Sequence, residues 1–230
     1  MRLTSVLVSA LIGLAAGQNP VTFQTQGTVD GGFAIPEDVA PGIYKVFIDT
    51  AGVAHHEKIG EPGAGAAPAS RIAETAAAAA VRDGDNAQLT LEPRLAASAK
   101  LGKRQDVFWQ YKCPDGKDRD HTLNHTDLTD AIDDLKNQCG DDLKVPSGWH
   151  IYATRGKVAA FFCNFQGLTN NCNRNTVETK RKDIIRECGD DWVAGWADWI
   201  MYIPGHSWSS LFSYGYHSIG DSKNFCGRDH

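Results

Sequence analysis

Apolar residues in the second half of the chain recur with the period of an amphipathic helix in two places. The first stretch begins at Asp127, and the second runs from about Thr176 to Cys188. Each stretch ends in the sequence Cys-Gly-Asp-Asp, and a glycine just past the last turn is a common helix terminus. The pattern therefore predicts two helices that end at Gly140 and Gly189.

Polar residues ahead of each stretch predict where the helices begin. Thr126 or Asp127 is expected to cap the first helix. Asn175 is expected to cap the second, with Glu178 at the reciprocal position of a capping box. Such caps satisfy backbone N–H groups that the first turn of a helix leaves without a partner.

Apolar runs after each helix predict antiparallel strands. Trp149–Thr154 and Val158–Phe165 form a predicted hairpin about Arg155-Gly156-Lys157. Ile200–Ile203 and Leu211–His217 are its expected counterpart. The order helix, strand, strand thus occurs twice, which either reflects an internal duplication or only repeats a good helix terminus. These elements predict an α+β fold, with an antiparallel sheet and two helices packed on one face.

The N-terminus has the pattern of a secretory signal peptide. Arg2 supplies the positive charge, Val6–Ala16 is apolar, and Ala15 and Gly17 are the small residues of a cleavage site. The apolar stretch has eleven residues, whereas a membrane-spanning helix needs ~20. We expect residues 1–17 to be removed, the protein to be secreted to the extracellular space, and no stable membrane insertion.

A second processing site is predicted at Lys103-Arg104, which resembles the dibasic sites of kexin-type proteases. All six tryptophans and all six cysteines follow this pair. Residues 18–104 would then be a propeptide, with one legible strand at 42–49, and residues 105–230 the mature domain. The alternative is that the pair is only a solvated surface feature.

The cysteines predict a disulfide framework, because an even number in a short exported segment usually pairs. A zinc site would need C-x-x-C spacing, which the chain lacks. Cys163 and Cys172 are near enough to close one short loop, and the full pairing stays open. The six residues are Cys113, Cys139, Cys163, Cys172, Cys188 and Cys226.

Charge argues against one class of partner. The chain carries a formal net charge of −5, whereas nucleic-acid binding requires a basic face. We therefore expect no nucleic-acid partner. No cofactor is expected either.

Histidines are the first candidates for chemistry. His121 and His125 are four residues apart, as helical metal ligands can be, but no third ligand follows at a recognisable spacing. His150, His206 and His217 are candidates for general acid–base work in a small secreted hydrolase or nuclease. Strand histidines are more often half-buried structural residues. The sequence thus assigns neither a metal site nor a catalytic residue.

Acidic pairs come directly after both predicted helices, and a glycosylation signal comes directly before the first. Asp141-Asp142 and Asp190-Asp191 are paired carboxylates, but glycosidases place their two acids on separated segments. Asn124-His125-Thr126 is an N-glycosylation sequon, so Asn124 is a candidate for a glycan in an exported protein.

An aromatic cluster near the C-terminus has two interpretations. Its residues either pack in the core or form an exposed surface for a sugar or a protein partner. At helical spacing the first three would share one face. The cluster consists of Trp192, Trp196, Trp199, Trp208, Tyr214 and Tyr216.

The signal peptide, the dibasic site and the six-cysteine region resemble small secreted proteins of filamentous fungi. The run Val158–Phe165, flanked by helices that end in Cys-Gly, is similar to the α/β-sandwich killer toxins and to necrosis-inducing extracellular effector proteins. The resemblance covers about residues 113–226 and implies a small disulfide-stabilised α/β sandwich and an effector or toxin function. This chain is more acidic and has fewer cysteines than the killer toxins, so no functional residue is carried over.

Three functions remain in competition. The leading hypothesis is a non-enzymatic effector or toxin that binds a protein or cell-surface target on a host or competitor. The second is a hydrolase or nuclease that uses histidine and aspartate. The third is a carbohydrate-binding module that uses exposed tryptophan.

Overall fold

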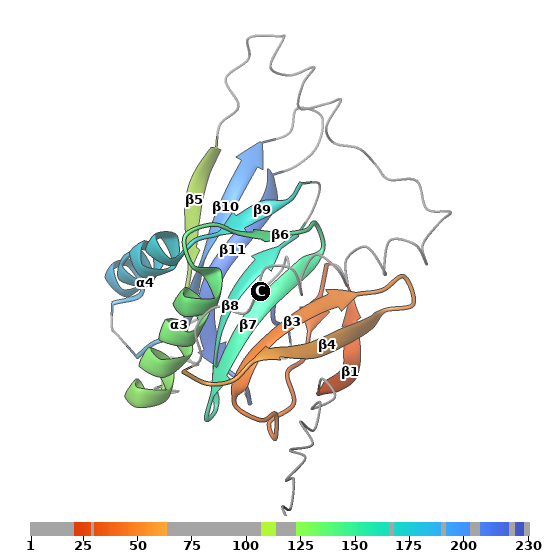
Figure 1. The fold of residues 1–230 in the computed structure, drawn as a ribbon. Helices are drawn as coiled ribbons and strands as arrows, with labels where there is room; N and C mark the ends of the chain where they lie inside the picture. Colours follow the sequence, from red (N-terminus) through yellow and green to blue (C-terminus); the bar gives the residue numbers. More distant parts are fainter. Residues whose placement is uncertain are drawn as a thin grey trace, which may run out of the picture.

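The computed structural model describes residues 21–28, 30–63, 107–113, 123–165, 168–189, 192–202, 208–220 and 224–227. The predicted signal peptide and the Lys103-Arg104 site lie outside these ranges. Within them the chain forms a large antiparallel sheet, a small two-stranded sheet and two helices (Figure 1), which confirms the α+β class. None of the described helices is long and apolar enough to cross a membrane.

The large sheet has the strand order β2-β1-β4-β3-β7-β8-β11-β10-β5. Its strands are β1 (Thr22–Thr28), β2 (Gly32–Phe33), β3 (Gly42–Ile48), β4 (Val53–Gly60), β5 (Val107–Lys112), β7 (Trp149–Arg155), β8 (Val158–Asn164), β10 (Gly195–Tyr202) and β11 (Trp208–Ser218). The small sheet pairs β6 (Leu143–Val145) with β9 (Asn170–Cys172). Strands from before and after the predicted processing site therefore share one sheet.

Both helices begin slightly earlier than predicted. Helix α3 spans His125–Cys139 and helix α4 spans Arg174–Cys188. Asn124 and Asn173 are the N-caps, and each side-chain oxygen accepts hydrogen bonds from the backbone N–H groups two and three residues later. The caps expected at Thr126, Asp127 and Asn175 are therefore wrong, because an asparagine was available just upstream and asparagine is among the best capping residues.

Both helices end where the sequence predicted. Gly140 and Gly189 follow the last helical residue with φ of 54° and 90°. A positive φ costs glycine little because it has no Cβ. The N–H groups of both glycines donate to carbonyls in the last turn, at Lys136 and Ile185.

The two helices pack on the same face of the sheet. Helix α3 contacts β7 and β8, and helix α4 contacts β5, β10 and β11. Figure 1 shows both helices on one side, over the part of the sheet formed by these strands. Their apolar faces bury Leu128, Ile132, Leu135, Val177 and Ile184 in one hydrophobic cluster with residues of the sheet.

The opposite face of the sheet has a core of its own, which we call the second core. The N-terminal strands supply much of it, and an antiparallel bridge joins Phe33 of β2 to Phe225 near the C-terminus. The second core therefore combines residues from both halves of the chain. Its members are Phe33, Ile35, Tyr44, Val46, Ala54, Tyr152, Ala159, Phe161, Cys163, Phe165, Trp196, Ile219, Phe225 and Cys226.

The two hairpins that follow the helices meet at the centre of the sheet. The predicted hairpin of β7 and β8 turns at Gly156, and the second hairpin is formed by β10 and β11. Strand β8 pairs with β11 from Phe212↔Asn164 to Ser218↔Val158. The two hairpins predicted from the sequence are therefore joined through the β8–β11 ladder.

Three disulfides connect the six cysteines, which confirms that they form a disulfide framework. A bond between Cys163 and Cys172, suggested by their closeness in sequence, is not formed. The last residue of each helix is instead bonded to the segment that precedes the other helix. The pairs are Cys113–Cys188, Cys139–Cys172 and Cys163–Cys226.

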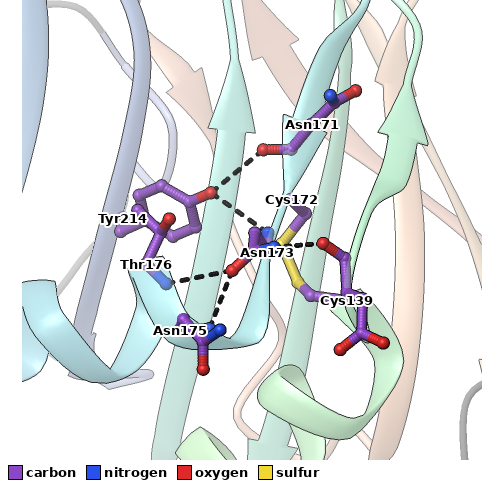
Figure 2. The surroundings of a disulfide bond; sticks show 8 residues. Cys139, Asn171, Cys172, Asn173, Asn175, Thr176 and Tyr214 are labelled. Carbon is purple, nitrogen blue, oxygen red and sulfur yellow. Dashed lines mark hydrogen bonds between the residues drawn. A yellow bond between two sulfur atoms is a disulfide. The ribbon is translucent and has the colours of Figure 1, made fainter.

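Figure 2 shows how the Cys139–Cys172 bond holds the end of α3 against the start of α4. Asn173, next to this bond, caps α4 and also donates its side-chain N–H to the carbonyl of Asp141. Tyr214 of β11 donates its hydroxyl to the Asn171 carbonyl and accepts from the Asn173 N–H. The disulfide therefore lies within a hydrogen-bonded junction of both helices and the sheet.

Candidate functional site

A pocket of about 490 Å³ lies over β1, β4 and β3. It lies beyond the region covered by the helices and is bounded by the first residue of β7. Its walls combine aromatic rings with charged and amide side chains. The lining residues are Thr22, Phe23, Gln24, Lys45, Phe47, His55, His56, Glu57 and Trp149.

An ion pair between a buried lysine and a partly exposed glutamate forms one side of the pocket. Lys45 lies in the middle of β3 between the apolar residues Ile43 and Phe47 and is only 1% exposed. Its Nζ lies 3.0 Å from Oε2 of Glu57, the residue opposite it in β4. The same Nζ lies 5.6 Å from the centre of the Trp149 ring. A buried cation requires such a partner, because desolvating an unpaired charge costs several kcal/mol.

His55 forms the second polar group of the pocket. Its Nε2 lies 2.7 Å from Oδ2 of Asp49, and its Nδ1 lies 3.1 Å from Nε2 of Gln24. The ring also stacks on Phe47 with centroids 4.8 Å apart. The hydrogen bond from His55, together with N–H groups of Val53 and Ala51, lowers the pKa of Asp49. Asp49 is thus held as a carboxylate that orients the imidazole.

The neighbouring residue, His56, points to the other side of β4 and has a structural role. Thr25 donates its only hydroxyl proton to the Ala34 carbonyl, so it accepts from Nε2–H of His56 at 2.9 Å. Nδ1 of His56 therefore accepts from the Tyr152 hydroxyl at 2.8 Å. Burial lowers the pKa of His56 to about 3, and burial raises that of Tyr152. Both side chains are neutral at ordinary pH.

The charged, amide and imidazole side chains of the pocket already have partners within the described residues. Lys45 is paired with Glu57, and His55 is held between Asp49 and Gln24. The positive charge of Lys45 is thus balanced by Glu57, and hydrogen-bonding side chains lie beside aromatic rings. Many small-molecule sites combine apolar surfaces with a few such polar groups.

The histidines proposed for acid–base work are not brought together. His150 is buried beside the second core, where its Nδ1 accepts from the Asn164 N–H at 3.2 Å. His217 lies on β11 opposite Ala159, whereas His150 lies on β7 opposite Cys163. Four residues of β8 separate these positions, or ~13 Å along a strand. His206, the third candidate, lies outside the described residues.

Metal binding gains no support from the described histidines. His125 is the first residue of α3 and stacks on Trp192, while His121 lies outside the described residues. His150 lies close to the sulfur atoms of Cys163 and Cys226, with the ligand atoms within 4.8 Å of one another. These two cysteines are joined in a disulfide, so neither sulfur is the thiolate that a metal would need.

The C-terminal aromatic cluster divides between core and surface. Trp196, Tyr214 and Tyr216 are buried, Trp196 in the second core and the two tyrosines under the helices. Trp192 and Trp199 are partly exposed. The helical alternative is wrong, because Trp196 and Trp199 lie in β10. The side chain of Trp208 lies outside the described residues.

The remaining predicted positions lie at helix ends. Asn124 is exposed, and its side-chain oxygen caps α3 while the amide nitrogen that a glycan would modify has no role in the cap. Asp141 is exposed and lies 3.3 Å from Arg174, which fits a solvated acid rather than a catalytic one. Asp190 and Asp191, like Lys103 and Arg104, lie outside the described residues.

The pocket was not predicted from the sequence. Two signals in the N-terminal half point to it. Lys45 interrupts the apolar row of a predicted strand, and His55 and His56 stand next to each other in an alternating stretch. Neither signal led to a predicted site, because residues 18–104 were interpreted as a propeptide that is removed. No known protein family, curated protein or solved structure matches this chain.

Proposed function

We propose that this protein is a secreted effector or toxin that binds a saccharide on the surface of a host or competitor cell, through the pocket over β1, β4 and β3. The predicted signal peptide and the three disulfides support secretion, because such bonds persist mainly in oxidising compartments. Of the expected fold, the structure shares the α+β class, with two helices on one face of an antiparallel sheet. Binding, not catalysis, is the proposed mode of action.

The observation that carries the proposal is the pairing of charges within the pocket. A charged ligand would compete with the Lys45–Glu57 pair, and depriving the buried Lys45 of its partner is costly. An uncharged hydroxyl both donates and accepts hydrogen bonds. It therefore adds to the alternating donors and acceptors of Lys45, Glu57, Gln24 and His55 without displacing them.

The aromatic surfaces of the pocket suit the same ligand. Phe47 stacks on His55 and lies 4.8 Å from Trp149, measured between ring centroids. A sugar ring has an apolar C–H face, and burial of that face against aromatic rings contributes through the hydrophobic effect. A saccharide unit thus matches both the polar and the apolar parts of the pocket.

Calorimetry with soluble oligosaccharides of fungal and plant cell walls tests the proposal. Gln24→Ala and His55→Ala should each weaken binding about three- to tenfold, because each removes a hydrogen-bonding group worth ~0.5–1.5 kcal/mol. Gln26→Ala is the matched control, since Gln26 is exposed on the same face of β1 outside the pocket. Binding that is absent, or equally affected by all three substitutions, would contradict the proposal.

The same experiment separates binding from catalysis. If the oligosaccharide is cleaved, and His55→Gln lowers the rate a hundredfold or more, the His55–Asp49 pair would be catalytic. Infiltration into leaves and application to competing fungi supply the biological measurement. A pocket variant that keeps its melting temperature should lose activity in proportion to its loss of saccharide binding.

A further inference from the structure

Residues 21–63, which we call the N-terminal segment, supply the four strands at one end of the large sheet, and the cysteine domain, residues 107–227, supplies the other five. Strand β3 pairs with β7 over six positions, from Gly42↔Thr154 to Phe47↔Trp149. These are neighbouring strands near the centre of the large sheet. Figure 1 shows β3, β4 and β1 continuing the sheet beyond β7. A propeptide that is later discarded would leave β7 as an open edge.

The second core depends on both parts. The N-terminal segment contributes Phe33, Tyr44 and Val46, and the cysteine domain contributes Tyr152 and Phe161 among others. All five side chains are at most 2% exposed. The helices cover only the other face of the sheet, so removal of the N-terminal segment would expose these large apolar groups to water, which is unfavourable in proportion to their area.

Polar contacts extend the same interface to its two ends. The N–H of Gly63 donates to Oδ1 of Asp134 in α3 at 2.8 Å. At the other end, Phe33 and Phe225 exchange two backbone hydrogen bonds of 2.9 Å. The N-terminal segment therefore contacts a helix, the central strands and the C-terminal residues of the cysteine domain.

No covalent bond other than the peptide chain joins the two parts. The N-terminal segment contains no cysteine, and the three disulfides all lie within the cysteine domain. An exposed strand edge with buried-type side chains is a site of aggregation. Retention of β3 protects β7 from that outcome.

We infer that the N-terminal segment is a permanent part of the mature protein, which becomes a noncovalent two-chain protein once the predicted cleavage after Lys103-Arg104 has occurred. The pairing of β3 with β7 and the second core hold the two chains together. The inference does not rest on the proposed function. The inference does affect the proposed function, because eight of the nine residues that line the pocket belong to the N-terminal segment.

To test the inference, the full chain is secreted from a kexin-competent host, and any uncut protein is then treated with a kexin-type protease. Native mass spectrometry should find one species that contains both chains. Denaturing electrophoresis without reductant should separate them. A native species with the mass of residues 105–230 alone would overturn the inference, and a chain that resists cleavage in both settings would overturn its two-chain part.

An interface variant provides a second measurement. Tyr44→Ala removes a fully buried ring of β3 that stacks on Tyr152, so the cleaved variant should lose its N-terminal segment at a urea concentration that leaves the parent intact. Gln26→Ala, exposed in the same segment, should behave like the parent. If Tyr44→Ala does not fold, the same urea titration of the cleaved parent remains decisive, because release of the segment without urea would contradict the inference.

Discussion

The phenol ring of Tyr44 in β3 stacks on that of Tyr152 in β7, with ring centroids 5.1 Å apart and planes inclined by 10°. Both rings are completely buried, and the two residues are directly opposite in the ladder. Aromatic pairs of this kind contribute ~0.5–1.5 kcal/mol beyond the burial of their area. The contact joins strands from the two sides of the predicted processing site, and it connects to the hydrogen bond between Tyr152 and His56.

The Tyr152 hydroxyl provides the first stability prediction. Tyr152→Phe keeps the ring that stacks on Tyr44 but leaves Nδ1 of the buried His56 without its donor. We expect a loss of ~1–3 kcal/mol in the free energy of unfolding, the usual cost of an unsatisfied buried polar group. Urea denaturation of the two proteins measures it. An unchanged unfolding midpoint would show that this hydrogen bond is not formed in solution.

The pH dependence of stability should report on His56. Its pKa is about 3 in the folded protein against 6.5 for an ordinary histidine. Between these values the unfolded chain binds a proton that the folded protein does not. Stability should therefore fall as the pH drops below ~6.5, by at most ~1.4 kcal/mol per pH unit from this residue.

Urea denaturation between pH 6.5 and 5 tests this expectation, because that window lies above the ordinary pKa range of carboxyl groups. The variant His56→Gln should be less stable at pH 7 but should lose less further stability over the window. Equal slopes for the variant and the parent would mean that folding does not lower the pKa of His56.

The ion pair between Asp134 and Arg155 lies where the N-terminal segment contacts helix α3. It gives a prediction with a matched control in the same helix. Asp134 is 2% exposed and binds Arg155 through Nε at 2.6 Å and Nη2 at 3.1 Å. It also accepts the N–H of Gly63. Asp134→Ala should cost ~3–5 kcal/mol, because it leaves a partly buried guanidinium and a backbone donor without their partner.

The neighbouring Asp133 is the matched control for this change. It is 53% exposed, and its only ion pair in the described part of the chain is with Lys136 in the same helix. Asp133→Ala should change the free energy of unfolding by less than ~1 kcal/mol. Similar losses for both variants, measured by chemical denaturation, would contradict a special role of the Arg155 contact, because alanine is the better helix former at both positions.

The disulfide between Cys139 and Cys172 should be essential to stability. Replacing both residues by serine should cost ~2–5 kcal/mol or abolish secretion, since the bond closes a loop between residues 33 positions apart. Replacing both avoids a new free thiol. Thermal melting measures the loss, and thiol titration of the denatured parent should find no free cysteine. A melting temperature that does not change would mean that the two cysteines are not bonded to each other.

Local structure was the part that the sequence determined. The ends of both helices at Gly140 and Gly189 and the hairpin about Gly156 are set by neighbouring residues. The periodicity of apolar side chains and the special freedom of glycine act within a few positions. The α+β class and the presence of a disulfide framework also followed from the sequence, because composition and element order suffice for both.

Pairing between distant segments was decided only by the tertiary structure. Cys163 bonds to Cys226 and not to the nearby Cys172, because the curled sheet brings the C-terminal residues against β8. Trp196 is a core residue for the same reason. Neither result is encoded in local spacing, since each depends on which strands become neighbours.

The role of the N-terminal segment shows this limit most clearly. Its sequence has one legible strand and neither cysteine nor tryptophan, and these features favour a discarded propeptide. In the fold, Tyr44 and Phe33 bury themselves against Tyr152 and Phe225. His55 and Lys45 form a pocket whose last wall, Trp149, comes from beyond residue 105. A sequence reports the preference of each segment alone, whereas burial depends on the surface that a distant segment presents to it.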